Sequence, residues 1–555
     1  MKPFFGLRGR ALNYAVLMTA GCDFLLFGYD QGVMGGILTM TQFLEYYPTI
    51  NTEEEGLENF PMLKKQRANK QGIAVASYNL GCFAGAVITI FISNALGRKR
   101  MIMLGTSIMI IGAAIMAGSN SLGMFIAGRF ICGLGNGGNT STIPTWQSET
   151  SHAHKRGKLV MIEGALITGG IMVSYWIDLG CSFIESSASW RFPLAFQIAF
   201  CIFILSFVWN LPESPRWLIL QGREDEAREV LAALEDKTVD SREVQNEFTA
   251  IKDVALESSK GRFKDLFTQG KGRNFHRTLL AYINQMFQQI SGINLITYYA
   301  AVIYSGLGMS SFLSRLLAAL NGTEYFIASW PAVFLVERVG RRKLMLFGAV
   351  GQAATMAILA GVNSRKETQY QIAGVVFLFV FNTFFAVGWL GMTWLYPAEI
   401  VPLRIRAPAN ALSTSADRYE PSHLANWIFN FLVVMITPVA FNSIEHHTYT
   451  VFAVINAFMV PSVYFFYPET AYRSLEEMDA IFHRVTGPSA YLDVVGVARD
   501  LPRRYGKNGE LLINYEETED HKARVAPTVH REYQSSSTSD AEKGAGPSAS
   551  GGAAS

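Results

Sequence analysis

Long runs of apolar residues, almost free of charge, recur along this chain and limit what it can fold into. The longest occupy residues 72–93, 101–117, 161–177, 192–211, 344–362 and 451–467. Each is close to the roughly 20 residues that an α-helix needs to cross the hydrocarbon core of a bilayer. Hydrophobic residues make up 50% of the chain and charged residues only 17%, whereas soluble domains are about one quarter charged. The sequence therefore predicts an all-α membrane protein.

Counting such runs, with breaks at charged residues, Gly and Pro, predicts twelve spans. They are expected near 12–40, 71–93, 101–118, 122–146, 159–181, 191–211, 276–305, 310–336, 343–362, 371–397, 423–445 and 449–467. Segments rich in Lys and Arg fall in alternate connections, at 97–100, 154–158, 212–275, 338–343 and 403–406. Because cytoplasmic loops carry this excess of positive charge, we expect these connections and both termini in the cytoplasm.

An internal repeat divides the chain into two related halves. Three motifs recur in the same order: Gly-Arg-Lys at 97–99 as Gly-Arg-Arg at 340–342, Glu149 with Arg156 as Glu399 with Arg406, and Pro-Glu-Ser at 212–214 as Pro-Glu-Thr at 468–470. Parallel repeats of this kind place a substrate site at their interface, near the midplane of the bilayer. The predicted organisation is a six-helix half at 1–211, a cytoplasmic linker with short helices at 212–275, a second six-helix half at 276–467 and a cytoplasmic tail at 468–555, mostly disordered after about residue 500.

A larger set of motifs keeps a fixed order along the chain. It comprises Phe-Gly-Tyr-Asp at 27–30, Leu-Gly-Arg-Lys at 96–99, Gly128 with Arg129, Pro-Glu-Ser-Pro-Arg at 212–216, Gln-Gln-Ile-Ser-Gly-Ile-Asn at 288–294 and Pro-Glu-Thr at 468–470. The set resembles the sugar porter family of the major facilitator superfamily, over roughly residues 10–485. Residues 139–149 and 175–178 look like fungal members, including their glycerol/proton symporter branch. The resemblance implies the major facilitator fold, with twelve transmembrane helices in two pseudo-symmetric halves, and alternating access without a cofactor or a metal site.

Asp30 and Arg129 are the first candidate site, for proton coupling. At about 1.5 Å per residue along helices that enter from opposite sides, both residues lie in the outer half of the membrane. An ionisable side chain in a span is costly unless it is paired or neutral, and by default it marks a transport pathway. In proton-coupled members of the family that the chain resembles, the matching Asp accepts the proton. A static ion pair is the alternative.

A symmetric set of charged residues lies at the predicted cytoplasmic ends of the spans: Arg98, Glu149, Arg156, Glu213, Arg341, Glu399, Arg406 and Glu469. The excess of positive charge in cytoplasmic loops explains the Arg residues, but it does not explain why Glu recurs at the same spacing in both halves. By the resemblance, we expect pairs between the halves to close the cytoplasmic side and to break when that side opens. The acidic residue usual before the first Leu-Gly-Arg is replaced within the run Ser-Asn-Ala at 93–95, which weakens one contact of the first half.

Amide and aromatic side chains in the later spans form the candidate substrate site. A polyhydroxylated ligand needs several donor and acceptor groups and an aromatic platform. The predicted residues are Gln288, Gln289, Asn294, Tyr298, Trp394, Asn426 and Trp427. A break at Ser291 and Gly292 in span 7 would let Gln289 and Asn294 face one cavity. Amides that bond between helices are the alternative.

Glu163 joins this set from span 5, at a position where sugar porters usually have Gln. Span 8 likewise has Tyr325 where an Asn is usual. A carboxylate accepts hydrogen bonds from sugar hydroxyls more strongly than an amide does, or it can titrate. These two departures leave the choice between a hexose and a smaller polyol open.

These features predict a proton-coupled importer of a monosaccharide or polyol in the plasma membrane. The expected partners are that small molecule, protons and the lipid bilayer; a net charge of +2 implies no nucleic-acid partner, and the oligomeric state is not indicated. The alternatives are a facilitative uniporter, a sucrose or other disaccharide transporter, and a sugar sensor that carries no flux. No nucleotide-binding or catalytic motif appears, so we expect no enzyme. A charged insert at 417–425 interrupts the resemblance before span 11, either as a cytoplasmic extension or as an error in the gene model.

Overall fold

The computed structural model describes residues 3–52, 54, 56–151, 156–259, 263–270, 272–365, 367–402, 423–473, 475–485 and 490–502. These residues form a helical bundle, and no β-strand occurs among them. The predicted disordered end of the tail, most of the insert at 417–425 and Arg406 lie outside the described residues.

Twelve membrane helices arise from the apolar runs, as predicted. The first half contains α1 (Gly9–Ile37), α3 (Pro61–Leu96), α4 (Arg98–Ala117), α5 (Leu122–Thr150), α6 (Arg156–Cys181) and α7 (Ala188–Val208). The second half contains the pair α11 (Asn274–Ile290) and α12 (Ile293–Gly306), then α13 (Ser311–Val339), α14 (Arg341–Val362), the pair α15 (Thr368–Gly388) and α16 (Met392–Ile400), α18 (His423–Ile444) and α19 (His447–Phe466). The fold class predicted from the sequence is therefore confirmed.

Hydropathy alone recognises most of these spans but not all. Within the described residues, nine helical segments are long and apolar enough to cross a membrane. The spans that fall outside this set are α5, the α11–α12 pair and α13, which carry buried polar side chains such as Arg129, Gln289 and Asn321. These polar side chains are placed inside the bundle, where other helices and not lipid surround them.

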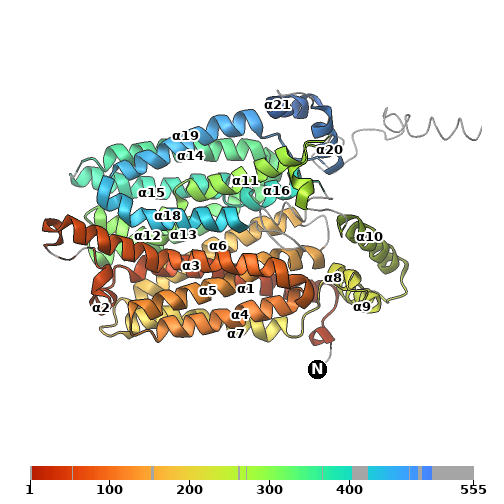
Figure 1. Ribbon diagram of the computed structural model, residues 1–555, viewed down its shortest axis with the longest axis horizontal. Helices are drawn as coiled ribbons and strands as arrows, with labels where there is room; N and C mark the ends of the chain where they lie inside the picture. Colours follow the sequence, from red (N-terminus) through yellow and green to blue (C-terminus); the bar gives the residue numbers. More distant parts are fainter. Residues whose placement is uncertain are drawn as a thin grey trace, which may run out of the picture.

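Short helices lie at the two ends of the bundle (Figure 1). We call one end the linker end, because it carries α8 (Pro215–Leu220), α9 (Glu224–Glu235), α10 (Arg242–Ser259), α20 (Leu475–Arg484) and α21 (Ala490–Asp500). The chain also begins at this end. The opposite end, which we call the far end, carries α2 (Thr41–Tyr46). The short helices predicted for residues 212–275 are present as α8, α9 and α10.

Glycine lets neighbouring helices inside the first half approach until their backbones touch. A Cβ added to Gly133 of α5 would lie 2.1 Å from the carbonyl oxygen of Tyr78 in α3, and one added to Gly81 would lie 2.1 Å from that of Phe130. A Cβ on Gly28 of α1 would lie 1.8 Å from the carbonyl oxygen of Ile167 in α6. Such small-residue contacts are the usual basis of close helix packing in membranes.

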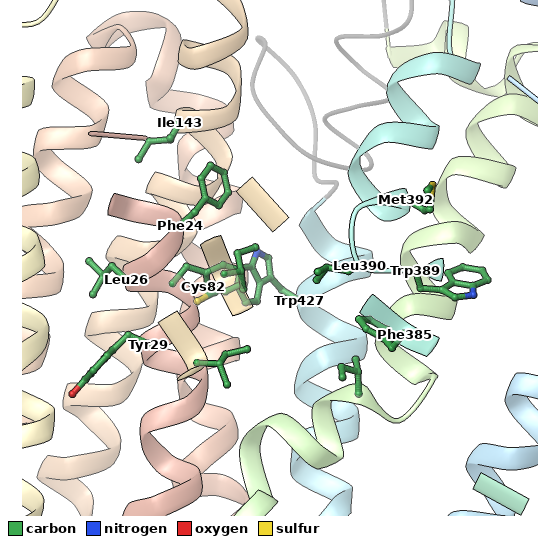
Figure 2. Close-up of a cluster of buried hydrophobic side chains, with 14 of the residues drawn as sticks. Phe24, Leu26, Tyr29, Cys82, Ile143, Phe385, Trp389, Leu390, Met392 and Trp427 are labelled. Carbon is green, nitrogen blue, oxygen red and sulfur yellow. The ribbon is translucent and has the colours of Figure 1, made fainter. Parts of the chain in front are cut away.

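The two halves meet along α3 with α18, α6 with α13 and α1 with α12. Figure 2 shows apolar side chains of both halves near this interface, with Trp427 of α18 beside residues of the first half. The rings of Trp427 and Phe27 lie edge to face with their centroids 5.5 Å apart. The interface therefore includes an apolar seam between the two halves.

Candidate functional site

A cavity lies between the halves, and the unfilled space between its lining atoms, including the part open to solvent, is about 510 Å³. Helices of both halves line it: Phe27, Gln31, Ile167, Ile171, Gln288, Gln289, Ile293, Asn294, Thr297, Tyr325, Phe385, Leu390, Trp394, Asn426 and Asn430. Apolar walls with a few convergent polar groups are typical of small-molecule sites. Of the predicted substrate residues, the structure brings Gln288, Gln289, Asn294, Trp394 and Asn426 to this cavity.

The amides form one hydrogen-bonded cluster on the wall of the second half. Gln289 Nε2 donates to Gln288 Oε1 at 2.6 Å and also contacts Asn426 Oδ1. Asn294 Nδ2 donates to Gln289 Oε1 at 2.7 Å. Four amide groups from α11, α12 and α18 thus meet at one point. The amides bond between helices, as the alternative interpretation predicts, and they also line the cavity. Their role in substrate binding stays a prediction.

The predicted break in span 7 is present and explains how these amides converge. Helix α11 ends at Ile290 and α12 begins at Ile293. Gly292 between them has φ +105°, a backbone conformation that residues with a Cβ rarely adopt. Because the helix stops and restarts, Gln289 and Asn294 lie on the same side, although a straight helix would separate them by about 140°.

Three predicted substrate residues lie outside the cavity lining. Tyr298 is fully buried and its hydroxyl donates to Asn79 Oδ1 at 2.9 Å. Trp427 packs behind Phe27, as described above. Glu163 is buried one helical turn nearer the linker end than Ile167, which does line the cavity. A role for Glu163 in selectivity stays a prediction.

Sequence reasoning missed Gln31, Thr297 and Asn430, which all line the cavity. Gln31 directly follows Asp30, and Asn430 lies four residues after Asn426, so it shares a helix face with a residue that was predicted. Asn430 Oδ1 also accepts a hydrogen bond from Asn79 Nδ2 of α3 at 3.2 Å. The spacing of the two Asn residues was the available signal.

Asp30 and Arg129 lie close together, as predicted, but Tyr78 of α3 lies between them. All three side chains are fully buried. The Tyr78 hydroxyl donates to Asp30 Oδ2 at 3.1 Å, and the Arg129 guanidinium lies 4.8 Å from the centre of the Tyr78 ring. No direct ion pair joins Asp30 and Arg129, both of which are described; Arg129 Nη2 donates instead to the carbonyl oxygen of Val75 at 3.2 Å. The Tyr78 side chain therefore contacts both the Asp30 carboxylate and the Arg129 guanidinium.

At the linker end of the first half, Arg98 is the centre of a charged cluster. Its side chain is fully buried and pairs with Glu149 at 3.1 Å, while Ser214 Oγ donates to the same carboxylate at 2.6 Å. The Glu213 carboxylate accepts hydrogen bonds from the backbone N–H groups of Arg98 and Lys99, both at 3.1 Å. Burial raises the pKa of Glu213, although these N–H donors favour its charged form.

The second half repeats the cluster with one addition. Arg341 pairs with Glu399 at 2.6 Å, Thr470 Oγ1 donates to Glu399 at 2.6 Å, and Glu469 accepts from the Arg341 backbone N–H at 2.9 Å. The addition is Glu337, which pairs with Arg341 at 2.8 Å. The corresponding position of the first half is Asn94. The first half has lost the acidic residue at this position, as noted in the sequence. The ion pair that Glu337 makes with Arg341 therefore has no counterpart through Asn94.

The predicted charge pairs between the halves would close the cytoplasmic side and break when that side opens, and they stay a prediction. The ion pairs of Arg98 and Arg341 described here lie within one half each. The physical reason is local: each Arg begins a helix directly after a Gly of positive φ, which places it beside the end of another helix of its own half. Of the other predicted members, Arg156 belongs to α6 but its side chain lies outside the described part, as does Arg406.

Hydrogen bonds between the halves run from the middle of the bundle to the far end. Thr168 bonds Ser329 at 3.3 Å near the middle. Further out, they join Tyr298 to Asn79, Tyr175 to the Thr297 carbonyl at 2.5 Å, Trp176 to Thr323 at 2.9 Å, and Arg315 to the Thr39 carbonyl at 2.9 Å. The far end is therefore closed across the interface.

A family model described as sugar (and other) transporter matches residues 15–482. The chain belongs to this family. It is thus a multi-pass membrane transporter and not an enzyme. Among its family relatives, the sugar transporter STL1 of Saccharomyces cerevisiae is 39% identical over 93% of this chain and 87% of the relative. The MFS-type transporter oryC of Aspergillus oryzae is 40% identical over 91% of each chain.

The fold matches that of a solved member of the major facilitator superfamily. The proton:xylose symporter XylE of E. coli superposes with a TM-score of 0.69, covering 85% of this chain and 99% of that protein. The sequence identity in this comparison is 23%, so the likeness is one of fold. It agrees with the arrangement of twelve helices in two halves described above.

Proposed function

We propose that the protein is a proton-coupled importer of a monosaccharide or polyol, which works by alternating access in the plasma membrane. The observation that carries the proposal is the pairing of two sites within one interface region: a cavity rich in amides and, in the first half, a buried carboxylate held by Tyr78 and Arg129. The relative named sugar transporter STL1 supports a sugar-like substrate.

The cavity suits a ligand that carries several hydroxyl groups. Each hydroxyl loses water on entry and needs a partner, and amides supply a donor and an acceptor on one flat group. Gln288, Gln289, Asn294 and Asn426 offer this from one wall, while Trp394 supplies an aromatic face. The substrate would replace hydrogen bonds that the amides now make to one another.

Asp30 suits the coupling role because it has two stable arrangements. As a carboxylate it is stabilised by the Tyr78 hydroxyl and the nearby positive charge of Arg129. As a neutral acid it no longer needs the charge. A proton thus changes the forces between α1, α3 and α5, and α1 and α3 themselves contact the second half.

The orientation follows from the positive-inside rule, which puts the linker end in the cytoplasm. Closure at the far end then describes a state whose extracellular side is shut. The clusters around Arg98 and Arg341 would stabilise one end state of the cycle by tying helices of the same half together.

Concentrative uptake by wild type and Asp30→Asn tests the proposal. We would reconstitute both in energised vesicles and offer hexoses, pentoses, polyols and sucrose. Wild type should concentrate one class, faster at low external pH and not after a protonophore. Asp30→Asn, which resembles the neutral acid, should exchange substrate but not concentrate it. Asp225→Asn on the exposed surface of α9 is the matched control and should behave as wild type.

The other readings predict different outcomes. A facilitative uniporter would equilibrate substrate without proton movement, and a disaccharide carrier would prefer sucrose. A sensor would bind without flux. Concentrative uptake by Asp30→Asn would remove Asp30 from the coupling role.

A further inference from the structure

A second carboxyl group, Asp23, lies in the middle of α1 and has no part in the function proposed above. It is fully buried. Asn139 Nδ2 of α5 donates to its Oδ1 at 2.8 Å and also contacts Thr106 of α4 at 2.9 Å. Its Oδ2 has no hydrogen-bond partner, and no described Lys, Arg or His forms an ion pair with it. A carboxyl group in these surroundings is costly when charged and is tolerated when it carries a proton.

Asp23 lies on the same face of α1 as Asp30. Seven residues separate the two, which corresponds to about two turns and about 10 Å along the helix axis. Asp23 is the nearer to the linker end. Asp23 is therefore placed to accept a proton that leaves Asp30 toward the linker end.

A polar stripe on α5 runs beside these two turns and touches both carboxyl groups. It consists of Cys132, Asn136 and Asn139, which lie within about 80° of Arg129 around the helix. Cys132 Sγ lies 3.9 Å from Asp30 Oδ2 at one end, and Asn139 bonds Asp23 at the other. The stripe therefore connects the two acids through the interior of the first half.

Several atoms along this stripe are buried and have no protein partner. They are Asn136 Oδ1, Asn139 Oδ1 and, on α7, Gln197 Nε2, whose own Oε1 lies 3.5 Å from Cys132 Sγ. Toward the linker end, Gln147 of α5 is also buried, and neither its Nε2 nor its Oε1 has a hydrogen-bond partner in the protein. Buried polar atoms of this kind are commonly bridged by ordered water, which also conducts protons.

We propose that Asp23 is a second proton-binding group, which receives the proton from Asp30 and releases it toward the linker end. The inference rests on the proposed proton coupling. The Asp30 carboxyl gives up its proton and becomes the carboxylate that Tyr78 and Arg129 stabilise; the Asp23 carboxylate takes up one proton and later releases it to water. One proton moves per cycle, and no group is oxidised or reduced. The other titratable groups that act on Asp23, or on which it acts, are Cys22 of α1 and Cys201 of α7.

The test separates net proton movement from substrate exchange, in the full chain reconstituted with a pH-sensitive dye inside the vesicles. The substrate is the one found with the panel above. Asp23→Asn keeps the shape and can still bond Asn139, so exchange of labelled for unlabelled substrate should stay within about twofold of wild type. Substrate-driven proton influx should fall at least about tenfold, because the relay group is missing. Asp23→Glu should restore part of the influx, and Thr19→Ala, one turn away on α1, should have no effect.

Each outcome decides the point. If wild type couples protons and Asp23→Asn carries the same proton flux, Asp23 is a structural residue and only this inference fails. If wild type moves substrate without protons, the proposed function fails first. If Asp23→Asn does not reach the membrane, Asp23→Ser replaces it, and equal loss of exchange and influx in Asp23→Ser would also overturn the relay.

Discussion

Gln289 is the residue on which the amide cluster depends. Its Nε2 contacts Gln288 and Asn426, and its Oε1 accepts from Asn294. Every other member of the cluster thus makes its hydrogen bond to this one side chain. A bound hydroxyl group that displaces one of these bonds leaves the rest of the cluster able to rearrange around it, since an amide can exchange donor and acceptor by rotation.

We therefore expect Gln289→Ala to weaken substrate binding by about 1 to 3 kcal/mol, the usual loss when buried polar groups are left without a partner. The affinity would be read from the concentration dependence of exchange or from binding to detergent-solubilised protein. Gln352→Ala is the matched control, because Gln352 of α14 is also a buried glutamine but does not line the cavity. Equal affinity in Gln289→Ala and wild type would assign the cluster to helix packing alone.

Among the helices, the α11–α12 pair carries the clearest link between sequence and site. Gly292 adopts φ +105°, and a Cβ there would lie 2.7 Å from Met356 Cε and 3.2 Å from the Phe452 ring. The break thus depends on a residue without a side chain for two reasons, backbone conformation and space. Asn456 of α19 further secures it by donating to the Ser291 carbonyl at 2.7 Å.

Gly292→Ala should lower the stability of the folded protein by roughly 1 to 3 kcal/mol, the cost of a strained backbone conformation. It should also weaken substrate binding, since Gln289 and Asn294 would lose their common orientation. Thermal unfolding of the purified protein, with and without substrate, would measure both effects. Gly361→Ala is the control: Gly361 lies in helix α14 with nothing within 4 Å of the added Cβ, so this change should be neutral or slightly stabilising. A wild-type melting temperature for Gly292→Ala would contradict the account.

Elements were easier to predict than contacts, and particular residues show why. Apolar length alone predicted α4 or α14, and a Ser-Gly pair between amides predicted the break after Ile290. Tyr78, Asn79 and Asn430 were not predicted, because the partners of their hydrogen bonds lie on helices remote in sequence. The interposition of Tyr78 between Asp30 and Arg129 requires the close approach of α3 and α5, which only the packed structure shows.

The whole molecule consists of two halves with unequal linker-end clusters. Arg341 has two carboxylate partners, Glu337 and Glu399, whereas the first half has Asn94 at the position of Glu337. The Arg98–Glu149 pair is the more deeply buried, with 1% and 8% of the two side chains exposed, against 5% and 23% for Arg341 and Glu399. Loss of the carboxylate charge is therefore expected to cost more in the cluster of the first half, where the pair is less exposed to water.

Glu149→Gln should accordingly slow transport more than Glu399→Gln does. Removing the charged partner of a buried Arg costs roughly 1.5 to 3 kcal/mol, and about 1.4 kcal/mol corresponds to a tenfold change. We expect the maximal uptake rate, per molecule at the cell surface, to fall at least about tenfold for Glu149→Gln and clearly less for Glu399→Gln. The control is Glu226→Gln, which removes an exposed pair with Arg223 on the linker and should have little effect. The reverse order of the two variants would show that Glu337 does not substitute for Glu399.

The glycine contacts inside the first half have a consequence for how such a chain changes over generations. Where Gly133 meets the Tyr78 carbonyl and Gly28 meets the Ile167 carbonyl, any larger residue would push two helices apart, whichever substrate the protein carries. The cavity is lined instead by side chains that can be exchanged without moving a backbone. Substitutions can therefore change the side chains that line the cavity while the packing of the surrounding helices is kept. A few such substitutions would be enough to change the substrate.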